Sequence, residues 1–184
     1  MAVTASFNAT TGVLTVFGDA LDNNIVISRN AAGQILVNGG AVQILGGTPT
    51  VANVSLIQAF GQAGNDTITI DETNGAMPKA NLFGGSGNDT LTGGSGNDML
   101  FGQDGNDTLL GDEGNDQIYG GGERDWIDGG DGVDTLRGES GNDTLVGGAL
   151  IDQLIGGPDQ DSFSPAERSA GEVLDFVVGV DREL

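Results

Sequence analysis

Aspartate recurs at a constant interval over the second half of the chain, and carboxylates at constant spacing can bind a metal cation. Nine contiguous segments of nine residues run from Gly84 to Ser164 without an inserted or deleted residue. They read GGSGNDTLT, GGSGNDMLF, GQDGNDTLL, GDEGNDQIY, GGGERDWID, GGDGVDTLR, GESGNDTLV, GGALIDQLI and GGPDQDSFS. Position one is always glycine, and position six is always aspartate: Asp89, Asp98, Asp107, Asp116, Asp125, Asp134, Asp143, Asp152 and Asp161. Each repeat therefore offers one candidate metal ligand at the same phase.

The ligand types favour calcium over magnesium. Calcium takes six to eight oxygen ligands, and carboxylates with backbone carbonyls are its usual partners in proteins. Glycines at positions one, two and four allow backbone φ values closed to other residues, so we expect consecutive carbonyl groups to turn toward one point. Magnesium demands a tighter octahedron and retains its water molecules, so a cage built from flexible loops suits it less.

The composition excludes several classes of function. The formal net charge is −21 with only 6 Lys and Arg residues, so the chain repels nucleic acid and requires a cationic partner. Cysteine and histidine are absent, which excludes disulfides, thiolate or imidazole metal sites and histidine-dependent nucleophilic catalysis. Acidity alone is also typical of a disordered chain, and abundant glycine of a flexible linker. Neither alternative requires the apolar residue that stands at position eight of every repeat: Leu91, Leu100, Leu109, Ile118, Ile127, Leu136, Leu145, Leu154 and Phe163.

The nonapeptides resemble the G-G-x-G-x-D-x-U-x repeat of the RTX family, the hemolysin-type calcium-binding proteins. The resemblance implies an all-β fold, a right-handed parallel β-roll or β-helix. In it the first six residues of each repeat form a turn and the last three a short strand. Two repeats then make one coil, and loops two repeats apart stack.

The resemblance also implies which residues bind calcium. Each ion would take one aspartate carboxylate and backbone carbonyls from two stacked loops, which gives seven formal sites on two edges. The implied pairs are Asp89 with Asp107, Asp107 with Asp125, Asp125 with Asp143, Asp143 with Asp161, Asp98 with Asp116, Asp116 with Asp134, and Asp134 with Asp152. The loop residues expected to supply the metal ligands are Gly84, Gly85, Ser86, Gly87, Asp89, Gly93, Gly94, Ser95, Gly96, Asp98, Gly102, Gln103, Asp104, Gly105, Asp107, Gly111, Asp112, Glu113, Gly114, Asp116, Gly120, Gly121, Gly122, Asp125, Gly129, Gly130, Asp131, Gly132, Asp134, Gly138, Glu139, Ser140, Gly141, Asp143, Asp152 and Asp161.

Several loops depart from the pattern. Glu123, Leu150 and Asp159 replace the glycine of position four, so we expect the sites that they build to be weak or empty. Gln103 and Asp112 at position two keep the carbonyl group but lose backbone freedom. We therefore expect about four well-formed ions and frayed C-terminal turns, and a repeat array that is disordered without calcium.

The chain divides into three parts: an N-terminal flank, the roll and a C-terminal flank. Residues 1–60 contain short apolar segments that predict an irregular β cap, with strands at Val13–Phe17, Ile25–Ser28, Ile35–Val37, Val42–Leu45 and Val54–Phe60. Residues 61–164 form the roll, which begins with the isolated copy GQAGNDTIT and is expected to bulge at Thr73–Lys79. Whether Asp66 shares an ion with Asp89 is left open. Residues 165–184 form a C-terminal cap, and the segment VLDFVVGVDREL resembles the DF-x-x-G-x-D segment that follows the roll in type I secreted RTX proteins. The alternative is a last strand or turn with Phe163, Leu174 and Phe176 as its apolar contacts.

The expected function is a calcium-binding module of a secreted bacterial RTX protein that passes a type I channel and folds outside the cell. The alternative is a C-terminal RTX tail or a carbohydrate- or surface-binding module of a secreted enzyme or adhesin. Outward-facing Met99, Phe101, Tyr119 and Trp126 could contact a polysaccharide or cell surface, and the roll ends could self-associate. No HExxH or G-x-S-x-G motif indicates an enzyme, and no segment indicates a cleavable signal or a membrane span.

Overall fold

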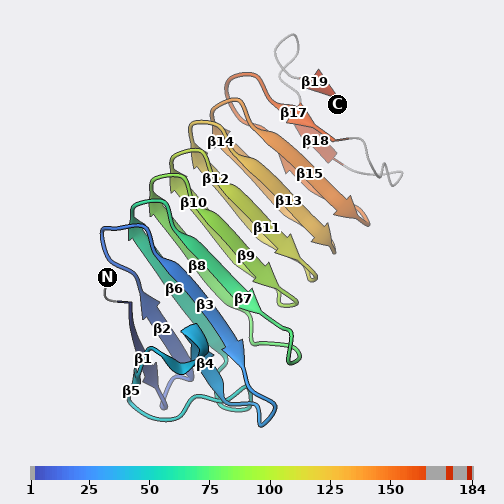
Figure 1. Cartoon of the computed structure of the whole chain (residues 1–184). Helices are drawn as coiled ribbons and strands as arrows, with labels where there is room; N and C mark the ends of the chain where they lie inside the picture. The colour runs from blue at the N-terminus through green and yellow to red at the C-terminus, as the bar shows by residue number, and fades with distance from the viewer. Residues whose placement is uncertain (1–2, 165–172, 176–181, 184) are drawn as a thin grey trace.

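The chain folds into two stacked sheets of short strands (Figure 1). The computed structural model describes residues 3–164, 173–175 and 182–183. The strands are β1 (Thr4–Asn8), β2 (Val13–Phe17), β3 (Asn24–Arg29), β4 (Ile35–Val37), β5 (Ile44–Leu45), β6 (Leu56–Ala63), β7 (Thr67–Asp71), β8 (Ala80–Ser86), β9 (Thr90–Gly94), β10 (Met99–Asp104), β11 (Thr108–Asp112), β12 (Gln117–Gly122), β13 (Trp126–Asp131), β14 (Thr135–Ser140), β15 (Thr144–Ala149), β16 (Gln153–Ile155), β17 (Ser162–Phe163), β18 (Val173–Asp175) and β19 (Arg182–Glu183). A short 3-10 segment, η1 (Asn38–Gly40), interrupts them, and the described residues contain no helix long and apolar enough to cross a membrane.

From β6 onward successive strands alternate between the two sheets, so the chain coils. One sheet has the order β18-β16-β14-β12-β10-β8-β6-β2-β1-β5, and the other has the order β19-β17-β15-β13-β11-β9-β7-β3-β4. Within the repeats each strand pairs in parallel with the strand two positions on, and the register places Leu100 beside Ile118 and Leu109 beside Ile127. The prediction of an all-β parallel roll with two nonapeptides in each coil is therefore confirmed.

The strands of the repeats are longer than the family pattern implies. β11 and β12 each span the last three residues of one repeat and the first two or three of the next. Only positions four to six remain as a turn. The expectation that six residues form the turn is therefore wrong, because main-chain pairing continues through the glycine-rich positions, for example between Gln103 and Gly85.

The N-terminal part contains antiparallel pairs, β1 with β2 and β3 with β4, and the parallel coils begin where β2 pairs with β6 and β3 pairs with β7. Strands were predicted at β2, β3, β4, β5 and β6, although β5 is shorter and β6 begins and ends later than expected. β1 was not predicted, since only Ala5 and Phe7 of this strand face the core. The pairs close the N-terminal end of both sheets.

The extra residues before β8 lie outside the coil, as the predicted bulge requires. No strand is present between the end of β7 at Asp71 and the start of β8 at Ala80. Glu72 Oε1 accepts a hydrogen bond from the Met77 N–H at 2.6 Å, and Arg29 Nη1 donates to the Ala76 carbonyl at 3.2 Å. The first contact closes the loop on itself and the second ties it to β3, and the strand pairing resumes at Ala80.

In the repeats each strand contributes one apolar side chain, that of position eight, to the core between the two sheets. Strand alternation turns positions six, eight and one toward the interior. All nine apolar residues of position eight are buried, and so are the aspartates of position six. Carboxylates therefore share the interior with Leu, Ile and Phe, an arrangement that needs a compensating cation or proton.

Five aromatic rings stack in one column on the outer face of the ten-stranded sheet. Neighbouring ring centroids lie 4.7–5.0 Å apart and adjacent planes differ by 2–16°. The rings are Phe17, Phe60, Phe83, Phe101 and Tyr119, and each directly precedes a glycine that opens a loop. Only the last two are apparent from the repeat pattern, because the first three lie before the strict repeats.

Replacing Phe83 with alanine is expected to lower the free energy of unfolding by about 2 kcal/mol, since each stacked pair contributes about 1 kcal/mol. Phe83 has two stacking partners, whereas Phe17 ends the column with one partner and is 41% exposed. The Phe17→Ala loss should therefore be roughly half as large. Urea denaturation of both variants at one saturating calcium concentration measures the difference. Equal losses would contradict a stacking contribution.

Candidate metal sites

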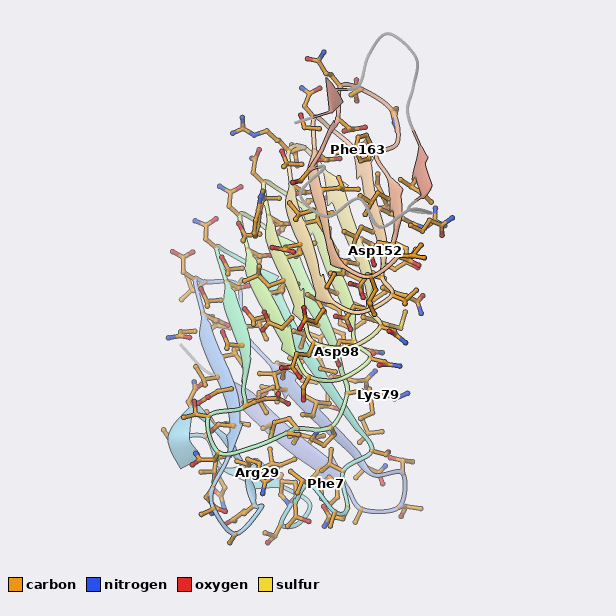
Figure 2. All side chains as sticks on the ribbon, turned by 90° about the vertical axis from the view of Figure 1, so that its right-hand side faces the viewer. Phe7, Arg29, Lys79, Asp98, Asp152 and Phe163 are labelled. Carbon is orange, nitrogen blue, oxygen red and sulfur yellow. The ribbon has the colours of Figure 1, made fainter. Side chains whose placement is uncertain are left out.

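The position-six aspartates form two columns, one on each edge of the roll. Asp89, Asp107, Asp125, Asp143 and Asp161 follow strands of the ten-stranded sheet, and Asp98, Asp116, Asp134 and Asp152 follow strands of the nine-stranded sheet. Asp98 and Asp152 mark two levels of one column in Figure 2. All are 0–3% exposed. Coil geometry therefore assembles each column from residues 18 apart in sequence.

Every pair of aspartates implied by the resemblance is a pair of stacked neighbours. In each of the seven pairs the N–H of the earlier aspartate donates to Oδ1 of the later one at 2.7–2.9 Å. The Asp66 N–H donates to Asp89 Oδ1 at 2.7 Å in the same way. Asp66 therefore extends the first column by one coil beyond the strict repeats.

The second carboxylate oxygen is buried and has no hydrogen-bond partner in eight of these aspartates. They are Asp66, Asp89, Asp98, Asp107, Asp116, Asp125, Asp134 and Asp143. The position-one glycines show where this oxygen points. A β-carbon at Gly84 would overlap Asp89 Oδ2 and lie 2.8 Å from the carbonyl oxygen of Gly102, in the next coil. The free oxygen thus faces the space between two stacked loops, where a cation would satisfy it.

Position-one glycine is required for space and not for its φ angle, which corrects the expectation from sequence. No position-one glycine has a φ in the left-handed region. Left-handed backbone occurs at positions two and four instead. The left-handed glycines there, which do not include Gly96 and Gly132 at position four, have φ between 96° and 142°, whereas the other residues have φ between 70° and 86°. The loops therefore accept a side chain by a small rotation toward the αL minimum.

The departures from the repeat keep the loop conformation. Glu123, Leu150 and Asp159 at position four have φ of 70°, 79° and 86°. Gln103, Asp112 and Glu139 at position two have φ of 83°, 72° and 73°, and Glu139 was not singled out from sequence as a departure. Aspartate stacking continues past all of them to Asp161. Weak binding in these loops stays a prediction.

Asn23 stands at position six of an earlier coil, where the repeats have aspartate, and its side-chain amide forms hydrogen bonds in place of a metal contact. Gly18 and Asn23 stand at positions one and six of a degenerate repeat that the sequence analysis missed, and the Asn23 N–H donates to Asp66 Oδ1 at 2.7 Å. Asn23 Nδ2 donates to the Leu21 carbonyl at 2.6 Å and to Asp19 Oδ1 at 3.0 Å. The amide nitrogen of Asn23 thus forms hydrogen bonds with nearby oxygen atoms. In the aspartate loops a bound cation would interact with the corresponding oxygen atoms instead. The spacing of Gly18, Asn23 and Ile25 was the available signal.

A second ladder, of position-five asparagines, supports the loops. The Asn106 N–H donates to Asn88 Oδ1 at 2.8 Å, and the Asn88 N–H donates to Asn65 Oδ1 at 2.8 Å. The same bond joins the Asn115 N–H to Asn97 Oδ1 on the other edge. These bonds run opposite to the aspartate bonds, so each pair of loops is tied in both directions. The recurrent GND triplet was the signal in the sequence.

Burial raises the pKa of the column carboxylates. Desolvation is the main cause, and neighbouring acidic groups add to it. The pKa values of Asp89, Asp116, Asp125 and Asp134 rise to about 7, and those of Asp98, Asp107 and Asp143 rise to about 6. At neutral pH the columns therefore need positive charge from protons or metal ions.

The donor set fits calcium. Among the described residues no group of three or more Asp, Glu, His or Cys side chains is placed to hold a metal. Backbone carbonyls must therefore complete the shell. A β-carbon at Gly105 would overlap the Gly87 carbonyl oxygen, and one at Gly121 would overlap the Gln103 carbonyl oxygen, so carbonyls of positions four and two point at the next loop. Carboxylates with carbonyls from two loops are an all-oxygen set of the kind that calcium prefers.

The predicted loop residues differ in what they can contribute. Position-six residues bring buried carboxylates, and positions one, two and four bring carbonyls or space. At position three the side chains of Ser86, Asp104, Glu113, Asp131 and Ser140 are exposed, so they lie outside the column. The predicted apolar contact through Phe176 lies outside the described residues, as does most of the C-terminal cap.

The comparisons agree with this geometry. The family model of the RTX calcium-binding nonapeptide repeat matches four overlapping segments, residues 83–118, 110–145, 119–154 and 137–164. Neither the curated proteins nor the solved structures gave a match. The matched segments contain seven of the eight buried aspartates with an unpartnered oxygen, and Asp66 lies before them. From residue 83 to residue 164 the chain is an array of the calcium-binding nonapeptide repeats of the RTX family.

Proposed function

We propose that this chain is a module of a secreted bacterial protein that stays unfolded where calcium is scarce and folds outside the cell on binding several calcium ions. The observation that carries the proposal is the set of eight buried aspartates, Asp66 and seven of the repeats, with one unpartnered oxygen each. A buried carboxylate without a partner costs several kcal/mol. Eight such groups in a narrow core couple metal binding to folding, so that the two become one event.

The proposed folding outside the cell follows from the expected affinity for calcium. Extracellular calcium modules typically bind with dissociation constants of about 10⁻⁴ to 10⁻³ M. Such sites are empty in a cytoplasm and filled outside the cell. RTX repeats are typical of secreted bacterial proteins, and the C-terminal segment resembles the one that follows the roll in type I secreted members. Both points support passage of an unfolded chain through a secretion channel.

A calcium titration tests the coupling of binding to folding. After removal of metal by a chelator at neutral pH, the far-ultraviolet circular dichroism is expected to lose most of its β signal, because the aspartate columns repel. Millimolar calcium should restore the signal, and the same concentration of magnesium should not. Light scattering on the same samples separates folding from association. A β spectrum unchanged by chelation would contradict the proposal.

We propose a binding and folding role and not a catalytic one, which the absence of histidine and cysteine from the sequence supports. A sugar-binding role for the outer aromatic residues has less support. Phe101 lies between Phe83 and Tyr119, with centroids 4.9 and 5.0 Å away, so both of its faces are covered. A sugar ring stacks on an open aromatic face, and the column offers mainly ring edges.

A further inference from the structure

One repeat departs from its neighbours at two outer positions at once. On the edge that carries Asp107 and Asp125, position five is an amide residue in every coil except that of Arg124: Asn65, Asn88, Asn106, Asn142 and Gln160. On the adjoining strands of the nine-stranded sheet, position seven is a hydroxyl residue in every coil except that of Trp126: Thr67, Thr90, Thr108, Thr144 and Ser162. Arg124 and Trp126 stand two residues apart, so both departures fall at one place on the molecule.

Arg124 interrupts the ladder of position-five asparagines. The Asn106 N–H donates to Asn88 Oδ1 at 2.8 Å, and the Arg124 N–H donates to Asn106 Oδ1 at 3.3 Å. The next bond would run from the Asn142 N–H to the side chain of Arg124, but a guanidinium group has no acceptor. Within the described residues this guanidinium group forms no hydrogen bond or ion pair. Arg124 therefore costs the array one ladder bond and adds no contact in return.

Trp126 has an open ring face, unlike the rings of the aromatic column on the other sheet. Parallel pairing places Thr108 on one side of Trp126 and Thr144 on the other, whereas Phe101 lies between two rings in the corresponding register. Threonine is too short to cover an indole ring, no other ring of the described residues stacks on Trp126, and this residue is 38% exposed. The indole thus presents apolar area to solvent where neighbouring coils have hydroxyl groups.

Both residues line one surface groove of about 350 Å³, together with Asn106, Thr108 and Thr144. The groove extends from the loop edge onto the nine-stranded sheet, since position five lies in the loops and position seven begins the strands. Its volume is at the lower end of the range of about 300–1,000 Å³ for small-molecule sites. It offers an apolar ring, a cation and two threonine hydroxyl groups that form no hydrogen bond to another described residue.

These groups fit a sugar. A pyranose ring has an apolar face that packs on an indole ring, and its hydroxyl groups accept hydrogen bonds from a guanidinium group and exchange them with threonine. A neutral sugar fits better than an acidic one, because the formal net charge of the chain is −21 and Glu123 and Asp125 flank Arg124 in the sequence.

We propose that the groove of Arg124 and Trp126 binds a hexose unit of a neutral polysaccharide, with the apolar face of the sugar ring on Trp126 and sugar hydroxyl groups accepting hydrogen bonds from Arg124. The site goes beyond calcium-dependent folding and requires only that the roll is folded. It gives the two departures, neither of which adds a contact to the fold, one common use. The rings of the aromatic column take no part, because their faces are covered.

The test measures binding of three neutral hexasaccharides, cellohexaose, maltohexaose and mannohexaose, by isothermal titration calorimetry at saturating calcium, with hexagalacturonate as the acidic probe. Trp126 is the only tryptophan, so fluorescence of the unaltered chain reports on the groove directly. Trp126→Thr and Arg124→Asn each install the residue of the neighbouring coils. Arg137→Asn is the matched control, because it removes the same charge from β14 in the other sheet, outside the groove.

At least one neutral hexasaccharide is expected to bind and to change the fluorescence of Trp126. Trp126→Thr should weaken that binding by about tenfold or more, Arg124→Asn by about fivefold, and Arg137→Asn by less than about twofold. Circular dichroism should show that all three variants fold at the same calcium concentration within about twofold, because the first two restore residues that the columns already contain.

Unweakened binding by Trp126→Thr, tighter binding of hexagalacturonate than of every neutral hexasaccharide, or no binding by the folded chain would overturn the inference. These outcomes leave calcium binding by the repeats intact. A β spectrum that calcium does not change would count against the proposed function instead, and the titration would still decide the sugar site.

Discussion

Lowering the pH from about 8 to about 5 without calcium is expected to restore β structure to the metal-free chain. The cause is the raised pKa of the buried aspartates, which burial lifts to about 6 for Asp98, Asp107 and Asp143 and to about 7 for Asp89 and Asp116. Protons would then replace calcium as the neutralising charge. Circular dichroism of a sample stripped of metal by a chelating resin measures the effect.

The sign follows from linkage. An aspartate in the unfolded chain has a pKa of about 3.9, below the pKa of about 6 or 7 in the folded columns. The folded state therefore binds more protons, and its contribution to stability is full below about pH 4 and is lost as the pH rises through about 6 to 7. In the same interval calcium competes with protons for the carboxylates, so more calcium is needed for half-maximal occupancy of the sites as the pH falls, whereas folding depends less on calcium.

Salt separates this effect from general charge repulsion. The chain has a formal net charge of −21 at pH 7, and acid also weakens that repulsion. About 1 M sodium chloride at pH 8 screens surface charges but does not remove the desolvation of buried carboxylates. Salt alone should therefore restore little β structure. Folding by salt equal to folding by acid would show that surface repulsion, and not the aspartate columns, keeps the metal-free chain unfolded.

Replacing Gly111 with alanine is expected to cost about 3 kcal/mol or more, because a new methyl group has no room. A β-carbon at Gly111 would overlap Asp116 Oδ2 and the Gly129 carbonyl oxygen and would lie 3.1 Å from Asp116 Cγ. The substitution displaces the carboxylate that faces the gap between loops. The calcium concentration at half-maximal folding should rise, as measured by circular dichroism.

Gly122→Ala is the matched control. Gly122 has no left-handed φ, and its added β-carbon would lie 3.8 Å from the nearest atom, the Gln103 carbonyl oxygen. It stands at position three, outside the column. This variant should stay within about 0.5 kcal/mol of the unaltered chain. A similar loss in both variants would show that glycine is needed for flexibility at every loop position. It would contradict the explanation that position-one glycine is required because a β-carbon has no room there.

The repeat made much of the fold predictable. Constant spacing of aspartate and of the apolar residue at position eight fixes which residues stack, because one coil consumes two repeats and parallel pairing then joins residues 18 apart. All seven aspartate pairs and the buried apolar row could therefore be derived before any coordinates. The reason given for position-one glycine was wrong, since the sequence alone shows that glycine recurs and not whether space or φ demands it.

Other features depend on contacts between coils. Asn23 meets Asp66, 43 residues away, and the aromatic column begins at Phe17, outside the strict period. The Gly105 N–H donates a hydrogen bond to Glu123 Oε2 in the next coil, a contact that the repeat pattern does not predict. The sequence by itself determined the period, the register and the candidate ligands, because these follow from residues at constant spacing along one chain. Only the tertiary structure decided which oxygen is left free and which side chains meet it, because those depend on how stacked loops face each other in space.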